Sequence, residues 1–294
     1  MVSLVEMSSF GGAARFVSVT IYTDPGCPFG FNAQRQELQL QWHYGHGLEI
    51  TRRMIVLTEQ STPWGEGGLT REIVASNLQR LRGQYGMPMV TKPQPRRTST
   101  LQGCHAYVGA RIHDPKRADV LLRNLRCRTF SEGQAIDELQ TIHGAAAEAG
   151  IPRETVEAWL ADHEVEAALQ EDIAAARAPL PEALALAHRL SKSDGGFRYS
   201  TASAVFETPE RRVVMAGFQP FAVYEIAIAN VAPGLERRVP AKSAQEILSW
   251  APYPLATAEV AELRQISRDD ARTELEQAGA RFSSTAGDGY WSFA

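Results

Sequence analysis

Cys27 and the residues around it are the part of the sequence most able to carry chemistry. They lie in the run Thr-Asp-Pro-Gly-Cys-Pro-Phe-Gly at 23–30, directly after an alternating, β-branched segment at 16–22 that predicts a buried strand. Pro28 suits the first turn of a helix, where its missing N–H costs nothing. We therefore expect Cys27 at a helix N-terminus, where unpaired backbone N–H groups and the helix dipole favour the thiolate. The sequence predicts that Cys27 is accessible and is the most nucleophilic of the cysteines.

The order of strand, turn, Cys-Pro and helix resembles the active-site segment of the thioredoxin superfamily. The run Asp24-Pro25-Gly26-Cys27-Pro28-Phe29 is most similar to the branch related to the disulfide oxidoreductase DsbA, which includes FrnE-like proteins, 2-hydroxychromene-2-carboxylate isomerases and kappa-class glutathione transferases. The resemblance implies an α/β fold in which a thioredoxin-like sheet carries a large all-α insertion. It also implies a catalytic Cys27 in an active-site motif that comprises Asp24, Pro25, Pro28, Phe29 and Gly30.

Gly30 stands where the redox members of this family carry a second cysteine. A glycine cannot attack the mixed disulfide that Cys27 would form, so release requires another thiol. The resemblance therefore implies a thiol–disulfide oxidoreductase that uses one cysteine, with glutathione or mycothiol as co-substrate and no bound cofactor. Cys104 or Cys127 could serve as a distant resolving thiol, although free cysteines are commonly small buried hydrophobic residues.

Two alternatives stay open for the same fold. The chain could be a glutathione- or mycothiol-dependent isomerase or transferase, in which the helix end at 27–30 stabilises the thiolate of the bound thiol. It could also be a redox-inactive member that binds a partner or a small molecule. Retention of Cys27 favours the oxidoreductase, whereas Gly30 favours the two alternatives.

A second site segment is expected at 199–203, where the chain enters a predicted hairpin. The resemblance implies that this loop lies against the active-site sulfur and normally carries a cis-proline. Here Thr201 is followed by Ala202. Because a cis bond before a residue other than proline costs about 2.5–4 kcal/mol, we expect a trans peptide at this point. In an alternative alignment Pro220 takes the role of that proline and residues 221–229 form a strand.

Composition excludes several classes of partner. The formal net charge of -4 gives no electrostatic case for binding nucleic acid or an anionic membrane. No apolar run approaches the roughly 20 residues that span a bilayer, and the first residues lack the pattern of a secretory signal. Three cysteines are too few for a disulfide scaffold, so we expect a cytoplasmic protein. No set of metal ligands is evident, and a homodimer is compatible with the sequence.

The chain divides into a discontinuous thioredoxin-like domain at 16–66 and 191–278, an inserted helical domain at 67–190, and tails at 1–15 and 279–294. Strands are predicted at 16–22 and 48–57, and a hairpin at 199–215. The helix starting at Cys27 ends near Gly45. The remaining helices are predicted at 69–85, 99–112, 115–128, 134–149, 153–161, 163–177, 181–190, 221–231, 243–251 and 257–278.

Overall fold

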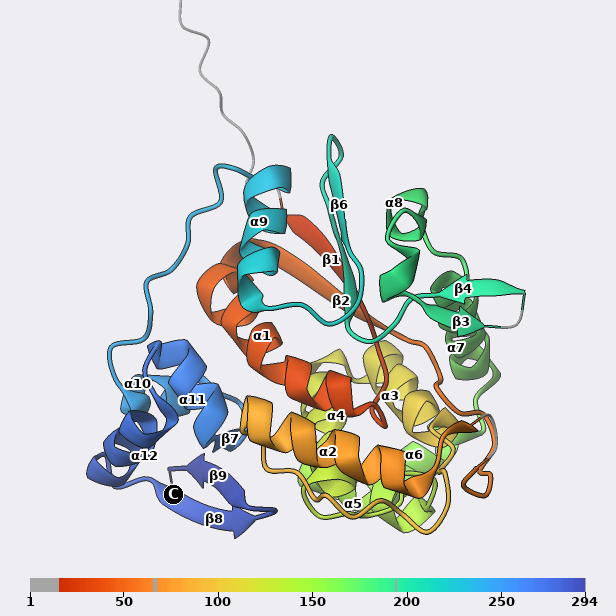
Figure 1. Cartoon of the computed structure of the whole chain (residues 1–294), viewed down its shortest axis with the longest axis horizontal. Coiled ribbons are helices and arrows are strands. Elements are labelled where there is room, and N and C mark those ends of the chain that lie inside the picture. The colour runs from red at the N-terminus through yellow and green to blue at the C-terminus, as the bar shows by residue number, and fades with distance from the viewer. Residues whose placement is uncertain (1–15, 66–67, 194, 294) are drawn as a thin grey trace, which may run out of the picture.

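The sheet at the centre of the fold consists of the predicted strands. The computed structural model describes residues 16–65, 68–193 and 195–293, so the expected tail at 1–15 lies outside the described residues. β1 (Val17–Thr23) pairs in parallel with β2 (Leu48–Met54), and β5 (Ser203–Glu207) runs antiparallel to both β1 and β6 (Arg212–Met215). The strand order is β2-β1-β5-β6 (Figure 1).

Helices cover both faces of this sheet (Figure 1). On one face, α1 (Pro28–Tyr44) and α9 (Phe221–Val231) pack on the side chains of alternate β1 residues, from Val17 to Ile21. On the other face, α7 (His163–Ala176) and α8 (Pro181–Leu184) pack around Tyr22. Because α9 begins directly after Pro220, the predicted helix is confirmed and the alternative strand at 221–229 is wrong.

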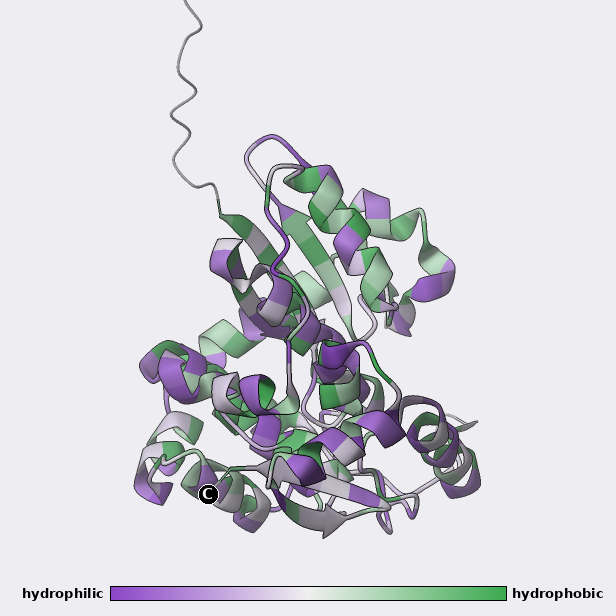
Figure 2. Cartoon of the chain, turned by 90° about the vertical axis from the view of Figure 1, so that its left-hand side faces the viewer, coloured by the Kyte–Doolittle hydropathy of each residue, from purple (hydrophilic) through white to green (hydrophobic). Residues whose placement is uncertain are grey.

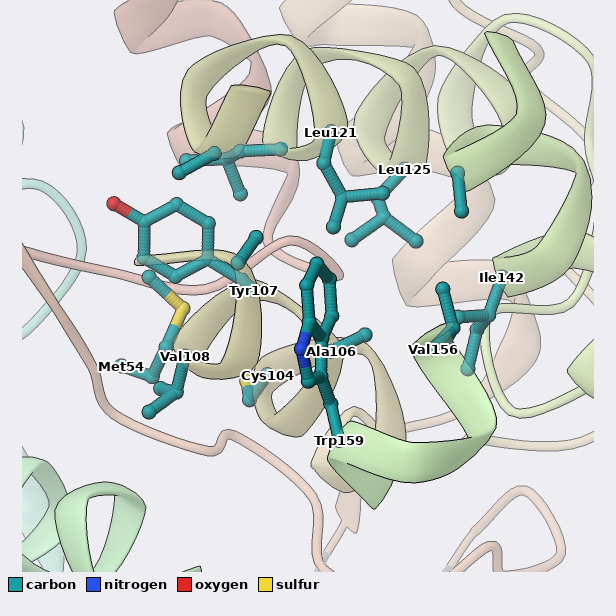
Figure 3. Packing of buried hydrophobic residues seen from close by; sticks show 14 of the residues in the cluster. Met54, Cys104, Ala106, Tyr107, Val108, Leu121, Leu125, Ile142, Val156 and Trp159 are labelled. Carbon is teal, nitrogen blue, oxygen red and sulfur yellow. The ribbon is translucent and has the colours of Figure 1, made fainter. Parts of the chain in front are cut away.

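Five of the helices between β2 and β5 form a second apolar core. They are α3 (Leu101–His113), α4 (Pro115–Phe130), α5 (Leu139–Glu148), α6 (Arg153–Leu160) and α7. The helix that precedes them, α2 (Arg71–Tyr85), packs instead with Phe31 of α1 and Phe130 of α4. Trp159 and Tyr107 lie at the centre of this core among aliphatic side chains from α4, α5 and α6, as Figure 3 shows. Met54 of β2 belongs to this core, so its apolar contacts hold α3 and α4 against that strand.

The C-terminal part differs from the sequence prediction. The single helix expected at 257–278 is two helices, α11 (Thr257–Arg264) and α12 (Arg268–Gln277), because Gln265 adopts a left-handed conformation and the Ser267 side chain caps the next helix. The tail expected at 279–294 contains a hairpin of β8 (Arg281–Thr285) and β9 (Asp288–Ser292). This hairpin pairs with β7 (Leu255–Ala256) and buries Trp291. α10 (Ala244–Trp250) forms as predicted.

Three further expectations need correction. The expected linker at 191–198 contains a small hairpin, β3 (Ser191–Ser193) with β4 (Gly196–Arg198). The helix expected at 181–190 is only the short α8 followed by a 3-10 turn at Ala187–Arg189, and a similar turn at Gly45–Gly47 follows α1. The helix expected at 134–149 starts only at Leu139, because the residues before it form turns.

Hydrophobic residues concentrate along the strands of the sheet, whereas the outer helices mix hydrophobic and hydrophilic residues (Figure 2). This distribution is typical of helices that present one face to a core and the other to water. Among the helices of the described residues, none combines the length and the hydrophobicity that crossing a lipid bilayer requires.

Candidate functional site

Cys27 lies at the N-terminus of α1, as the sequence predicts. It has extended backbone angles, it is the N-cap residue of the helix, and Pro28 follows in the first turn. The backbone N–H of Cys27 donates to the Asp24 carbonyl at 3.2 Å, and the Phe31 N–H donates to the Cys27 carbonyl at 2.9 Å. The tight turn after β1 thus delivers the sulfur to the end of the helix where free amides gather.

The expectation that Cys27 is accessible and readily ionised is wrong. The residue is only 6% exposed, and burial raises the pKa of its thiol above the ordinary value. Backbone amides of Gly30 and Phe29 and the Thr201 side chain act in the opposite direction and lower that pKa, whereas the charge of Asp24 raises it. The helix end favours the thiolate, but the cost of removing an anion from water is the larger effect here.

The loop at 199–203 packs against this turn, and its peptide bond differs from the prediction. The Thr201–Ala202 peptide is cis, not trans. Hydrogen bonds around it hold the loop: the Ser203 N–H donates to the Ser200 carbonyl at 2.9 Å, and the Ser203 hydroxyl accepts from the Gly217 N–H at 2.8 Å.

The buried Asp24 carboxylate holds the Cys27 turn in place by accepting hydrogen bonds. One carboxylate oxygen accepts the Gly26 N–H at 2.7 Å. The other accepts the Leu57 N–H and the Thr100 hydroxyl, both at 2.8 Å, and lies 3.6 Å from the Cys104 sulfur. Burial raises the pKa of Asp24, while these donors lower it. The carboxylate therefore connects the Cys27 turn to the end of β2 and to the start of α3.

Gly30 fits a space that is closed on three sides. A Cβ atom at this position would lie 3.1 Å from a methyl of Thr201, 3.1 Å from the Thr23 hydroxyl and 3.2 Å from the Asp24 carbonyl oxygen. Such distances are shorter than ordinary van der Waals contacts, and the carbonyl belongs to the backbone, which yields little. The absence of a side chain at this position thus lets the helix end approach both the Thr201 loop and β1.

Substitution of Gly30 by alanine is therefore expected to destabilise the protein by about 1–2 kcal/mol, because overpacking outweighs the gain in helix propensity. Gly45→Ala at the other end of α1 is the matched control. A Cβ there would have no neighbour within 4 Å among the residues that the structure describes, and the φ of Gly45, -53°, is helical. That variant should be more stable by about 0.4–1 kcal/mol. Urea denaturation measures both effects, and equal effects would contradict the packing described for Gly30.

The remaining predicted site residues lie around the turn or farther away. Phe29 is half-buried and contacts the ring of Phe218. Cys104 in α3 faces Asp24, and burial raises the pKa of its thiol. Cys127 in α4 faces the hydroxyl of Tyr290 in β9 at 3.3 Å instead. Pro25 is buried, and a Cβ at Gly103 of α3 would lie 3.4 Å from its ring.

Sequence reasoning missed three residues that contact this turn. Thr23 and Thr100 supply hydroxyl groups, and Arg126 of α4 donates to the Thr23 hydroxyl at 2.6 Å. Arg126 carries a signal that could have found it, because it recurs four residues after Leu122 and four before Phe130 on the apolar face of α4. A charged residue at such spacing indicates a buried ionic contact. Within the described residues, no group of histidine, cysteine or carboxylate side chains could hold a metal ion.

Comparison with known families agrees with this geometry. The family model described as a DSBA-like thioredoxin domain matches residues 18–179, which is more than half of the chain. The chain therefore belongs to the DSBA-like thioredoxin domain family. The matched part contains β1, the Cys27 turn, β2 and the helices up to α7. Comparison with curated proteins gave no match.

Solved structures share the fold at low sequence identity. The cytosolic disulfide reductase DsbM from Pseudomonas aeruginosa is 18% identical with a TM-score of 0.51, over 73% of this chain and 100% of that one. A probable DsbA oxidoreductase from Streptomyces coelicolor is 22% identical with a TM-score of 0.53, over 78% of this chain and 94% of that one. These similarities establish a DsbA-like fold with helices inserted into a thioredoxin-like sheet.

Proposed function

We propose that this protein is a thiol–disulfide oxidoreductase that acts through Cys27 alone and uses a small thiol, glutathione or mycothiol, to complete its cycle. The observation that carries the proposal is the set of groups that converge on the sulfur. The Phe29 and Gly30 amides and the Thr201 side chain all lower its pKa. The Thr201 hydroxyl is buried and has no other partner among the described residues, so it is free to donate to a thiolate.

The proposed chemistry needs two exchanges. The Cys27 thiolate attacks one sulfur of a disulfide, forms a mixed disulfide and releases the other half as a thiolate, which takes up a proton. A glutathione thiolate then attacks the sulfur of the bound half, which restores the Cys27 thiolate and releases a glutathione mixed disulfide. Gly30 supplies no competing thiol, so the external thiol is required in every cycle.

The experiment that tests this proposal is glutathione-dependent reduction of a small disulfide such as hydroxyethyl disulfide. Wild-type protein should turn the disulfide over, and Cys27→Ser should reduce the rate to that of glutathione alone. Cys127→Ser, which changes a thiol directed at Tyr290, is the control and should keep the activity. Turnover that survives in Cys27→Ser would overturn the proposal.

The pH dependence of Cys27 follows from its burial. Since burial raises the thiol pKa, the protonated form persists above the ordinary cysteine value of about 8.5. Alkylation of Cys27 by iodoacetamide in the folded protein should therefore rise with a midpoint above that of a free cysteine. The unfolded chain releases this proton at lower pH, so the thiol's contribution to stability is present below the unfolded pKa and is lost as pH rises through the folded pKa.

Burial of Cys27 also favours a second candidate, a redox-inactive binding member of the fold. At 6% exposure the sulfur offers a disulfide a narrow approach, and the raised pKa reduces the thiolate fraction at neutral pH. The same turnover experiment separates the two candidates, because a binding protein would show no glutathione-dependent reduction while remaining folded.

We also propose that the protein works in the cytoplasm. The proposed cycle consumes a reduced small thiol, and cells keep such pools reduced in that compartment. All three cysteines are free thiols, which suits a reducing environment.

A further inference from the structure

We propose that Arg126 of α4 is a positioning residue whose guanidinium supplies the counter-charge for a Cys27 thiolate from beneath the turn. The inference rests on the proposed function, in which Cys27 must ionise. Arg126 donates to the Thr23 hydroxyl at 2.6 Å, and that same oxygen would lie 3.1 Å from a Cβ at Gly30. The guanidinium therefore lies directly below the Cys27–Gly30 turn, with Thr23 between them.

The charge of Arg126 is only partly balanced. Its side chain is 2% exposed, and its ion pair with Glu37 is long, at 3.8 Å. Its Nε atom has no hydrogen-bond partner among the described residues. Glu37 is shared with Arg52, which it binds at 2.8 Å through its other oxygen. A buried cation in this situation gains from any further anion nearby, because desolvation leaves its charge poorly compensated.

Arg123, one helical turn earlier on α4, provides the contrast. Its side chain is equally buried, but both of its terminal nitrogens donate to Glu259. In the part of the chain that the structure describes, no other arginine forms an ion pair with this carboxylate. Of these two buried arginines of α4, Arg123 is therefore fully paired, whereas Arg126 shares its carboxylate with Arg52. The arginine that shares its partner is the one beneath Cys27.

The electrostatic coupling between Arg126 and Cys27 also supports the proposal. Burial lowers the pKa of Arg126, whereas the charges of Glu37 and of an ionised Cys27 raise it. Coupling between two charges is reciprocal, so Arg126 favours the Cys27 thiolate to the same extent. Other charged groups also act on this pair. The charge of Arg52 lowers the pKa of Arg126, and the charge of Asp24 disfavours the Cys27 thiolate. Arg198 is half-buried and is therefore better screened by water.

The test is the pH profile of Cys27 alkylation, read at that residue by peptide mass spectrometry. Arg126→Gln removes the counter-charge, so the midpoint should rise by about one unit and the rate at pH 7.5 should fall about tenfold. Arg126→Lys keeps the charge and should retain most of the rate. The polar cavity of about 50 Å³ beside Arg126 gives water access to the space that a shorter side chain leaves.

Arg123→Gln is the matched control, because it also removes a buried arginine from α4. It should lower thermal stability and leave the midpoint of Cys27 unchanged. Equal shifts of that midpoint in Arg123→Gln and Arg126→Gln would overturn the proposal, because they would reflect general damage to the fold.

The Glu37→Gln variant is expected to shift the Cys27 alkylation midpoint in the direction opposite to that of Arg126→Gln. Removing this carboxylate leaves Arg126 with more uncompensated charge, so the Cys27 midpoint should fall and alkylation at pH 7.5 should become several-fold faster. If Cys27 of the Glu37→Gln variant is alkylated at the same rate as in the wild type or more slowly, the proposal is overturned. This test holds even if the Arg126→Gln variant does not fold. Alkylation needs no disulfide turnover, so the two proposals can fail separately. If the Arg126 variants shift the Cys27 alkylation midpoint as predicted but the protein reduces no disulfide, only the proposed function is rejected. If the protein reduces disulfides but the Arg126 variants leave this midpoint unchanged, only the present inference is rejected.

Discussion

Glu259→Gln is expected to lower the free energy of unfolding by about 3–5 kcal/mol, the range typical of a buried ion pair that loses one partner. Glu259 is completely buried, and both of its carboxylate oxygens accept hydrogen bonds from Arg123. One of them also accepts the Ala256 N–H at 2.7 Å, at the start of α11. Glutamine would leave the Arg123 cation buried without a counter-charge.

The consequence extends beyond one ion pair, because this contact connects α4 to the C-terminal elements. Arg123 lies over the rings of Tyr253 and Tyr290, at 4.9 and 5.1 Å from their centroids. Loss of the pair should therefore loosen the attachment of β9 as well as α11. Chemical denaturation followed by tryptophan fluorescence reports both, since Trp291 is buried in β9.

An exposed ion pair on the same protein gives the control. Arg153 and Glu157 are one turn apart on α6, and both side chains are well exposed. Glu157→Gln should leave stability almost unchanged, because water screens an exposed ion pair. If Glu259→Gln is no more destabilising than Glu157→Gln, then Glu259 does not carry the buried charge that the structure assigns to it.

Asp24→Ala is expected to cost about 2–5 kcal/mol, because it leaves the Gly26 and Leu57 N–H groups and the Thr100 hydroxyl without their acceptor. Each buried or half-buried donor that loses its partner costs about 1–3 kcal/mol, and water reaches part of this site. The variant should also change Cys27, since the Asp24 charge raises the pKa of that thiol. We expect the alkylation midpoint to fall while stability falls, if the turn keeps its shape.

The Thr100→Val variant measures how much the Thr100 hydrogen bond contributes to the loss of stability expected for Asp24→Ala. It removes one donor to Asp24 and keeps a side chain of similar shape beside Gly26, with an expected cost of about 1 kcal/mol. Urea titrations of the two variants provide the comparison. An Asp24→Ala variant as stable as Thr100→Val would show that Asp24 does not organise the turn.

Local patterns in the sequence predicted the parts of the fold that depend on local signals. The alternation of 16–22, the proline after Cys27 and the helical spacing of Phe221, Tyr224 and Ile228 each gave the correct element. Conformations that depend on the surrounding structure were missed. Nothing in the sequence near Gln265 predicts its left-handed conformation, and the pairing of β8 with β9 is stabilised by burial of Trp291 against residues far away in the chain.

The candidate site could be predicted only in part for the same reason. The helix N-terminus at Cys27 follows from Pro28 and the turn, so its position was correct. The Thr201 loop, which lies against the Cys27 turn, is distant in sequence, so a prediction from the turn alone did not include the burial of Cys27 and gave the wrong direction for the thiol pKa. Arg126 was missed for a related reason, because its contact with Thr23 crosses 103 residues.

Mass spectrometry of the folded protein after exposure to oxidised glutathione tests most directly whether Cys27 attacks a disulfide, forms a mixed disulfide and is released by a small thiol, because oxidised glutathione is itself a small disulfide substrate. The account predicts one glutathione, attached to Cys27, which excess reduced glutathione removes. Cys104 and Cys127 should stay unmodified until the protein is denatured. A folded protein that acquires no glutathione on Cys27, or acquires it on Cys127 instead, would contradict the account.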